Sequence, residues 1–240
     1  MASKGTVIVT GASQGIGAAT VHNFLERGYE VVATSRSISR SKLVPSQKLA
    51  LIDGDIGHPA TAAKVVESAV SRFGAIHHVI NNAGIFQAKP FLNYTIDEFH
   101  RFVSTNLEGF LHMTQLAVKQ ILSQGSGGSI TTITSSLVEN PIAGVTASVP
   151  MMTKGGLDSV TVNLAMEYAK QGIRFNAVAP GIVDTPLHRD SPKEFLKGLS
   201  PLGTITTADE IAEAVVFLTE SKQITGEVLH VDGGAHSGRW

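Results

Sequence analysis

A glycine-rich turn near the start of the chain has the composition of a phosphate-binding loop. Residues 10–17 read TGASQGIG and stand between a β-branched run and a helical pattern. Glycine lets the backbone turn sharply and approach a pyrophosphate, and the amides at the start of the following helix attract the anion. The spacing is Gly-xxx-Gly-x-Gly rather than the usual Gly-x-Gly-x-x-Gly, and a tight turn without a ligand is the alternative. The predicted dinucleotide-binding residues of this turn are Gly11, Ser13, Gln14, Gly15, Ile16 and Gly17.

Composition excludes several other kinds of chemistry. The 240 residues include no cysteine, so disulfides, thiol catalysis and thiolate metal sites are excluded. The nine histidines show no His-xxx-His or His/carboxylate spacing that is typical of metal ligands, and no metal site is predicted. A formal net charge of −1 does not support a nucleic acid as partner. No apolar run is long enough for a signal-peptide core or a membrane span, so we expect a cytoplasmic protein with no membrane partner.

Short β-branched runs alternate with longer helical patterns. Strands are expected at 6–10, 30–35, 49–52, 75–81, 129–134, 173–178 and 227–231, and helices at 15–27, 60–73, 97–122, 151–170 and 207–219. This alternation predicts an α/β fold in which a doubly wound parallel sheet carries helices on both faces. No linker or repeat interrupts the series, so residues 1–240 are expected to form one domain.

Residues 184–206 differ from the rest because three prolines interrupt them and no long periodic element is present. Insertions of this size are often lids or binding loops, with a plain surface excursion as the alternative. The apolar side chains of the segment predict a mostly apolar cover; they are Leu187, Phe195, Leu196 and Leu199.

Seven motifs in order resemble those of the short-chain dehydrogenase/reductase family, over essentially the whole chain. They are the glycine-rich turn, Asn81-Asn82-Ala83-Gly84, Asn106, Ser135-Ser136, Lys154, the Asn176–Gly181 segment with Pro180, and Val231-Asp232-Gly233-Gly234. The resemblance implies a single-domain Rossmann fold with seven parallel strands and an NAD(P) cofactor. It also implies a homo-oligomer, either a tetramer or a dimer.

The end of the second expected strand bears on the choice of cofactor. An acidic residue there would bind the 2′-hydroxyl of NAD, but this chain has Ser35 followed by Arg36. A hydroxyl and a guanidinium suit the extra phosphate of NADP, so NADP(H) is favoured and NAD(H) remains possible. Arg36 on a solvated loop without a ligand is the alternative.

The resemblance also assigns cofactor contacts along the chain. It implies that Asp55 meets the adenine, Asn81 and Gly84 the ribose side, and Ile182 and Thr185 the nicotinamide carboxamide. The other predicted cofactor-binding residues are Ile56, Asn82, Ala83, Lys154, Pro180 and Gly181.

In the family, a tyrosine is the general acid/base, and a lysine four residues later lowers its pKa and binds the nicotinamide ribose. A serine polarises the substrate carbonyl and an asparagine supports a proton-relay water. By this resemblance Asn106, Ser136 and Lys154 are catalytic, with Ser135 as an alternative to Ser136. The alternatives are a structural asparagine, a turn serine and a surface lysine.

The tyrosine of this pattern is missing from the chain. Pro150 stands four residues before Lys154, and no tyrosine of the chain has a lysine at the fourth following position. Proline is compatible with the first turn of a helix, and Ser148 is a candidate cap, so the fold should survive. The three tyrosines are Tyr29, Tyr94 and Tyr168.

Two functions remain open. The first is an NADP(H)-dependent oxidoreductase for a small carbonyl or alcohol, with an altered proton donor. That donor would be water held by Lys154 and Asn106, or a hydroxyl of Ser136, Thr146 or Ser148. The second is a non-catalytic NADP-binding sensor or structural subunit.

Overall fold

Seven parallel strands form one sheet in the computed structural model, which describes residues 3–238. The spatial order is β3-β2-β1-β4-β5-β6-β7. All strands pair in parallel, and all seven expected strands are present. Their bounds are β1 Thr6–Thr10, β2 Glu30–Ser35, β3 Leu49–Asp53, β4 His78–Asn81, β5 Gly128–Ile133, β6 Ile173–Pro180 and β7 Val228–Val231.

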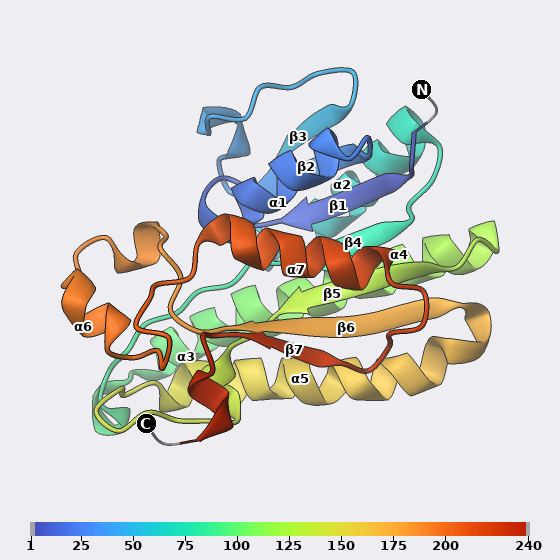
Figure 1. Ribbon diagram of the computed structural model, residues 1–240. Helices are drawn as coiled ribbons and strands as arrows, with labels where there is room; N and C mark the ends of the chain where they lie inside the picture. The colour runs from blue at the N-terminus through green and yellow to red at the C-terminus, as the bar shows by residue number, and fades with distance from the viewer. Residues whose placement is uncertain (1–2, 239–240) are drawn as a thin grey trace.

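Helices cover both faces of the sheet (Figure 1). One buried apolar cluster includes side chains of α1 and α7, and the other includes side chains of α2, α4 and α5. This two-sided burial explains why the central strands are continuous apolar runs rather than alternating ones. The helices are α1 Gly15–Glu26, α2 Pro59–Phe73, α3 Ile96–Phe102, α4 Gly109–Gln124, α5 Ser148–Tyr168, α6 Lys193–Lys197 and α7 Ala208–Glu220.

The long helix expected at 97–122 is not continuous. A π-helical segment, Val103–Glu108, separates α3 from α4. The chain therefore keeps its overall helical direction but gains an extra residue in one turn, which changes the side-chain positions that follow. Such π segments are frequent at functional sites.

Two other boundaries differ from the expectation. Strand β4 begins at His78 rather than at 75, because the side chain of Gln124 takes both backbone hydrogen bonds of Ile76 (2.9 and 2.8 Å). Helix α5 begins at Ser148, and Ala147 is its N-cap without a side-chain hydrogen bond. The expectation that Ser148 caps this helix is therefore wrong, since Ser148 is already its first helical residue.

The 184–206 segment leaves the sheet after β6 and returns before α7. Its two ends are joined by a parallel bridge between Val183 and Thr206, in which Thr206 N donates to Ile182 O (3.1 Å). Short turns and α6 occupy its middle, and Leu196 is buried while Leu187 and Phe195 are exposed. Within residues 3–238, no helix has both the length and the apolar character needed to cross a membrane.

Candidate active site

The loops that follow β1 and β4 are tied together at the carboxyl edge of the sheet. The buried hydroxyl of Thr10 accepts hydrogen bonds from the backbone N–H groups of Asn82 and Ala83 (3.1 and 3.0 Å). The side-chain amide of Asn82 donates to Thr10 O (2.8 Å) and Gly11 O (3.1 Å). The strand order reverses between β1 and β4, and ligands of open α/β sheets bind at such a switch point.

The glycine-rich turn lies beside this switch point. A Cβ on Gly11 or Gly17 would lie 2.9 or 2.5 Å from Asn82 Nδ2, so only glycine fits these two positions. Gly15 has a φ of +55°, and a Cβ there would lie 3.2 Å from Thr185 Cγ2. Two segments that the sequence assigns to the cofactor therefore meet, although they are 170 residues apart.

The first turn of α1 has free backbone donors. Gln14 is the N-cap and its side chain makes no capping hydrogen bond. The N–H groups at the start of the helix thus have no side-chain partner, which leaves them available to an anion. Ser13 and Ile16 beside them are half-buried, and Gln14 is exposed.

At the end of β2, the two residues predicted to choose the cofactor are placed differently. Arg36 is exposed, whereas Ser35 Oγ is buried and has no hydrogen-bond partner. The neighbouring carboxylate of Asp53 accepts hydrogen bonds from Ser39 Oγ (2.6 Å) and Ser39 N (2.9 Å), and these lower its pKa. Arg36 is consequently the side chain here that is free to meet a ligand phosphate.

The loop after β3 reaches the same edge of the sheet. Asp55 Oδ1 accepts a hydrogen bond from Gly57 N (3.0 Å), which fixes the turn. Ile56 is buried and packs against Gly109, where a Cβ would lie 2.7 Å from Ile56 Cγ2. Ile56 therefore contributes mainly to the core beneath the site.

Asn106 lies in the π segment and is 1% exposed. Its Oδ1 accepts from Ile85 N (2.8 Å), and its Nδ2 donates to Ile85 O (3.2 Å) and to Thr153 Oγ1 (2.9 Å). The hydroxyl of Thr153 in turn donates to Pro150 O (2.8 Å). Asn106 thus joins the loop after β4 to the first turn of α5.

Lys154 is 8% exposed and meets Asn106 at Gly84. A Cβ on Gly84 would lie 3.3 Å from Lys154 Nζ and 3.4 Å from Asn106 Oδ1. Lys154 Nζ donates to Ile133 O, the carbonyl at the end of β5 (2.6 Å). Burial lowers the pKa of Lys154 to about 8, although the nearby Asp158 opposes this change.

The two serines after β5 have different surroundings. The Ser135 hydroxyl accepts a hydrogen bond from Leu137 N (3.3 Å) and starts a short 3-10 turn, Ser136–Val138. Ser136 is 4% exposed, and Val138 of the same turn lies against Gly155 of α5. The structure therefore brings Ser136 to the same helix start as Lys154 and gives Ser135 a local capping contact.

Pro150 occupies the first turn of α5, as the sequence predicts for a proline in a helix. Its side chain is buried, whereas Met151 is half-buried and Met152 is 58% exposed. The position one turn before Lys154 on α5 is accordingly a buried apolar side chain.

The segment after β6 closes the other side. Gly181 packs on Asp232, since a Cβ on Gly181 would lie 2.7 Å from Asp232 Cβ, and its N–H donates to Val231 O (3.1 Å). Pro180 is the last residue of β6 and is buried. Ile182 follows, so the predicted carboxamide-binding residues stand next to the base of the 184–206 segment.

Three residues that sequence reasoning did not assign are part of this arrangement. Thr10 joins the two loops, Thr153 carries the contact from Asn106 to Pro150, and Asp158 lies buried one turn after Lys154. An acidic residue on the apolar face of a helix is a signal that could have identified Asp158. Among the described residues no group of three His, Cys, Asp or Glu side chains could hold a metal ion.

Comparison with known proteins shows a match along nearly the whole chain. The family model described as enoyl-(acyl carrier protein) reductase matches residues 11–236. L-rhamnose 1-dehydrogenase (NAD(P)(+)) of Sphingomonas sp. is 33% identical in an alignment of 245 residues that covers 96% of each chain. The 3-oxoacyl-[acyl-carrier-protein] reductase FabG of Salmonella typhimurium is 31% identical, over 95% of this chain and 96% of the relative.

Solved structures agree with these relatives. A short-chain type dehydrogenase/reductase from Mycobacterium marinum superposes with a TM-score of 0.90 at 26% identity, covering 98% of this chain and 97% of that one. The 3-ketoacyl-(acyl-carrier-protein) reductase of Brucella melitensis, solved with NADH, gives 0.88 at 28% identity, covering 98% and 99%. ElxO, solved with NADP bound, gives 0.88 at 26% identity, covering 98% and 100%.

Proposed function

The chain belongs to the short-chain dehydrogenase/reductase family, and from this premise we propose an NADP(H)-dependent oxidoreductase that works without a tyrosine proton donor. Its substrate would be a small carbonyl or alcohol compound. Residues 1–240 would form one dinucleotide-binding domain.

One observation carries the proposal: Lys154 and Asn106 meet at Gly84, on the carboxyl edge of the sheet. Burying an ammonium group costs free energy unless the charge is paired, and we assign this charge to binding of the nicotinamide ribose. The Lys154 ammonium has three donors and uses one on Ile133 O, so two remain for a ligand.

The residues present fit a dinucleotide. The uncapped start of α1 offers backbone N–H groups to the pyrophosphate, and Gly15 brings the turn close to Thr185. Exposed Arg36 would take the 2′-phosphate of NADP, as a guanidinium forms strong hydrogen bonds with phosphate. The similar ElxO was solved with NADP and the similar Brucella reductase with NADH, which supports a nicotinamide cofactor and leaves NAD(H) as a second possibility.

Proton delivery would depend on Lys154 and Asn106. When bound, NADPH supplies the hydride. Asn106 Oδ1 accepts one hydrogen bond, from Ile85 N, and so retains an acceptor site, while Lys154 retains two donors. Together they can hold a water molecule that gives a proton to the product oxygen and takes one from the Lys154 ammonium, which solvent then reprotonates. Ser136 would polarise the carbonyl, and Pro150 would replace the phenol with an apolar wall.

Calorimetric titration and a substrate screen test this proposal. NADP(H) should bind more tightly than NAD(H), and a panel of aldehydes and ketones should show turnover that Lys154→Ala abolishes. Lys170→Ala is the matched control, because Lys170 is an exposed lysine just after α5. Turnover that is equally strong in Lys154→Ala would place the chemistry elsewhere, and failure to bind either dinucleotide would overturn the proposal.

Pro150 also supports a second candidate function. A positioned general acid typically raises the reaction rate by about 10²–10⁴-fold. A non-catalytic NADP-binding sensor or structural subunit would tolerate the loss of this acid, because it needs no turnover. Tight dinucleotide binding without turnover on any carbonyl or alcohol would favour this candidate.

Assembly into a homo-oligomer and a cytoplasmic location stay predictions. Exposed apolar side chains on α4 and α5 support the first, namely Leu111, Leu122, Val162 and Met166. Sedimentation analysis of the purified protein would decide between monomer, dimer and tetramer.

A further inference from the structure

Asp158 is a buried carboxylic acid that nothing in the proposed chemistry uses. It lies on α5 and is 9% exposed, and both of its carboxyl oxygens are buried without a hydrogen-bond partner. The neighbouring Thr134 hydroxyl lies 3.4 Å from Val178 O, and its hydrogen bonding toward Asp158 lowers the pKa of that carboxyl group. A buried carboxyl group that is poorly hydrogen-bonded destabilises a fold, so its presence calls for a reason.

Lys154 is the cation that Asp158 faces along its own helix. The two residues are four positions apart, which places them one above the other on the same face of α5. Lys154 Nζ reaches Ile133 O, and Asp158 lies beside Thr134, the next residue of the chain. The two side chains therefore meet consecutive residues at the end of β5 and interact through buried space.

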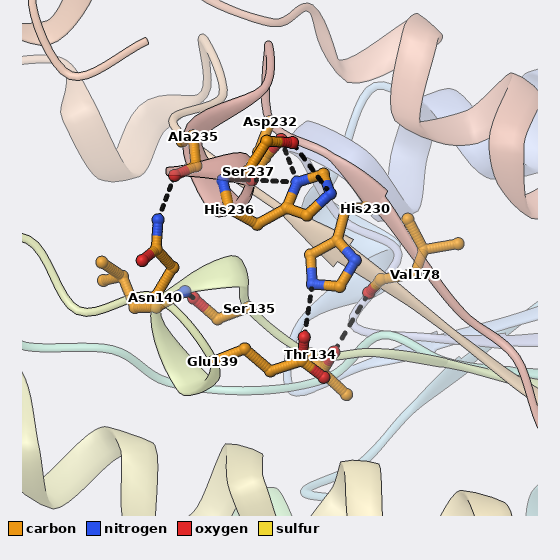
Figure 2. Close-up of polar contacts among 11 residues, drawn as sticks. Thr134, Ser135, Glu139, Asn140, Val178, His230, Asp232, Ala235, His236 and Ser237 are labelled. Carbon is orange, nitrogen blue, oxygen red and sulfur yellow. Dashed lines mark hydrogen bonds and ion pairs between the residues drawn. The ribbon is translucent and has the colours of Figure 1, made fainter. Parts of the chain in front are cut away.

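A second group of ionisable side chains lies in the loop after β5 and at the end of β7 (Figure 2), and two of them, Glu139 and His230, act on the charge of Asp158. His230 Nε2 lies 3.4 Å from Glu139 Oε2, with the side chains 11% and 58% exposed. The His230 ring stacks on His236 (centroids 4.0 Å apart), and His236 Nδ1 is 3.0 Å from Asp232 Oδ1. Glu139 is therefore the more exposed of the two members that act on Asp158, and His230 is the more buried.

Charges and burial act on Asp158 in opposite directions. Burial raises its pKa, and the charge of Glu139 acts the same way. Thr134, Lys154 and His230 lower it. Asp158 in turn favours the charged form of Lys154, against the burial that lowers the pKa of that lysine to about 8.

We propose that Asp158 is a positioning residue of this site, which keeps Lys154 in its charged form, and that His230 supports Asp158 in this role. This inference rests on the proposed function, since it assumes that charged Lys154 binds the nicotinamide ribose. Neutral Lys154 would offer weaker hydrogen bonds to that ribose, because bonds to a charged donor are about twice as strong.

The test is the pH dependence of NADP(H) binding, measured calorimetrically in the full-length protein from pH 6 to 9. In the unmodified protein, affinity should fall about tenfold as pH rises through about 8, where Lys154 loses its proton. In Asp158→Asn this fall should move about one pH unit lower, as expected for removing a charge about 6 Å away at an effective dielectric constant between 20 and 80. His230→Gln should move it in the same direction by less.

Glu167→Gln is the matched control, because it removes an exposed carboxylate from the same helix, 13 residues after Lys154. It should leave the pH profile unchanged, and Asp158→Glu should restore most of the original profile. Binding with an unshifted profile in both Asp158→Asn and His230→Gln would overturn the inference and leave the proposed function intact. The absence of dinucleotide binding in the unmodified protein would instead overturn the proposed function. If Asp158→Asn does not fold, His230→Gln alone decides.

Discussion

Replacing Thr10 by valine tests the contact on which the site is built. Valine has nearly the same shape as threonine but lacks the hydroxyl. The hydroxyl of Thr10 accepts from the backbone N–H groups of Asn82 and Ala83 (3.1 and 3.0 Å) and donates to Ile80 O (3.3 Å). Thr10→Val therefore removes the acceptor of the Ala83 N–H group, whereas the Asn82 N–H group keeps its second acceptor, Ile80 O (3.1 Å).

The expected cost follows from these contacts. Leaving one buried donor without a partner costs about 1–3 kcal/mol of unfolding free energy. For a chain of this size, about 1 kcal/mol shifts Tm by 2–4 °C, so Tm should fall by about 2–12 °C. Loosening of the same loop should also raise the Kd for NADP(H) about tenfold, the equivalent of roughly 1.4 kcal/mol.

Thr6→Val is the matched control for this measurement. Thr6 stands on the same strand and is equally buried, but its hydroxyl has no hydrogen-bond partner. Its replacement should be neutral or slightly stabilising in urea unfolding and in calorimetry of the ligand-free protein. Equal losses of stability in Thr6→Val and Thr10→Val would contradict a role for the Thr10 hydroxyl, because the position of both residues on a β-strand would then explain both losses.

Three further changes test other parts of the site. Pro150→Tyr should raise the rate of NADPH-dependent carbonyl reduction by up to about 10²–10⁴-fold, because it would place a phenol one turn before Lys154. No gain in rate would show that the pocket differs from that of the family at more than this residue. Arg36→Ala should raise the Kd for NADP(H) about 10- to 100-fold and leave that for NAD(H) unchanged, as measured by calorimetry; an equal effect on both would remove Arg36 from the phosphate site. Lys154→Met should stabilise the ligand-free protein at pH 7 by about 3 kcal/mol in urea unfolding, since the pKa of Lys154 is lowered from 10.5 to about 8. That gain should shrink as pH rises from about 8 to above 10.5, and a destabilised Lys154→Met at pH 7 would contradict it.

The strands were predictable because their physical cause is local. A strand that is buried on both faces is a short apolar run. Seven such runs, each separated from the next by a loop or a helical pattern, favour a parallel sheet over other folds. The need for glycine at positions 11 and 17 was also predictable from the motif. The structure adds a physical reason, because a Cβ at either position would lie too close to Asn82. The family and the seven-stranded Rossmann sheet were supplied by the resemblance, and the order of the strands was not predicted.

The π segment was not predictable from helical spacing. One extra residue in a turn leaves the apolar stripe around Asn106 almost unchanged, so the pattern at 97–122 reads as one helix. The start of β4 was missed for a different reason: Gln124, 48 residues from Ile76, takes the hydrogen bonds that a strand would have used. Contacts between distant side chains of this kind leave no local pattern.

The assigned roles of the site residues stay predictions, but their placement narrows the alternatives for two of them. A surface lysine was one alternative for Lys154, and the structure shows it buried; a structural asparagine was the alternative for Asn106, whose amide does hold Ile85 and Thr153. A structural role and a catalytic role of Asn106 are compatible. The amide that holds the loop after β4 also holds Gly84 against Lys154.

Pro150 and Lys154 differ in what they cost the free energy of folding. Pro150 costs the fold little, because the first turn of a helix has N–H groups without intrahelical partners and a proline there loses no hydrogen bond. Lys154, in contrast, destabilises the ligand-free protein by about 3 kcal/mol at neutral pH, with one hydrogen bond to Ile133 O and no carboxylate within ion-pair distance among the described residues. A sequence that only had to fold could replace this lysine by an apolar residue. Position 150, where the resemblance would place a tyrosine, can therefore vary without loss of structure, whereas we attribute the cost of Lys154 to the proposed ligand that would bind its charge.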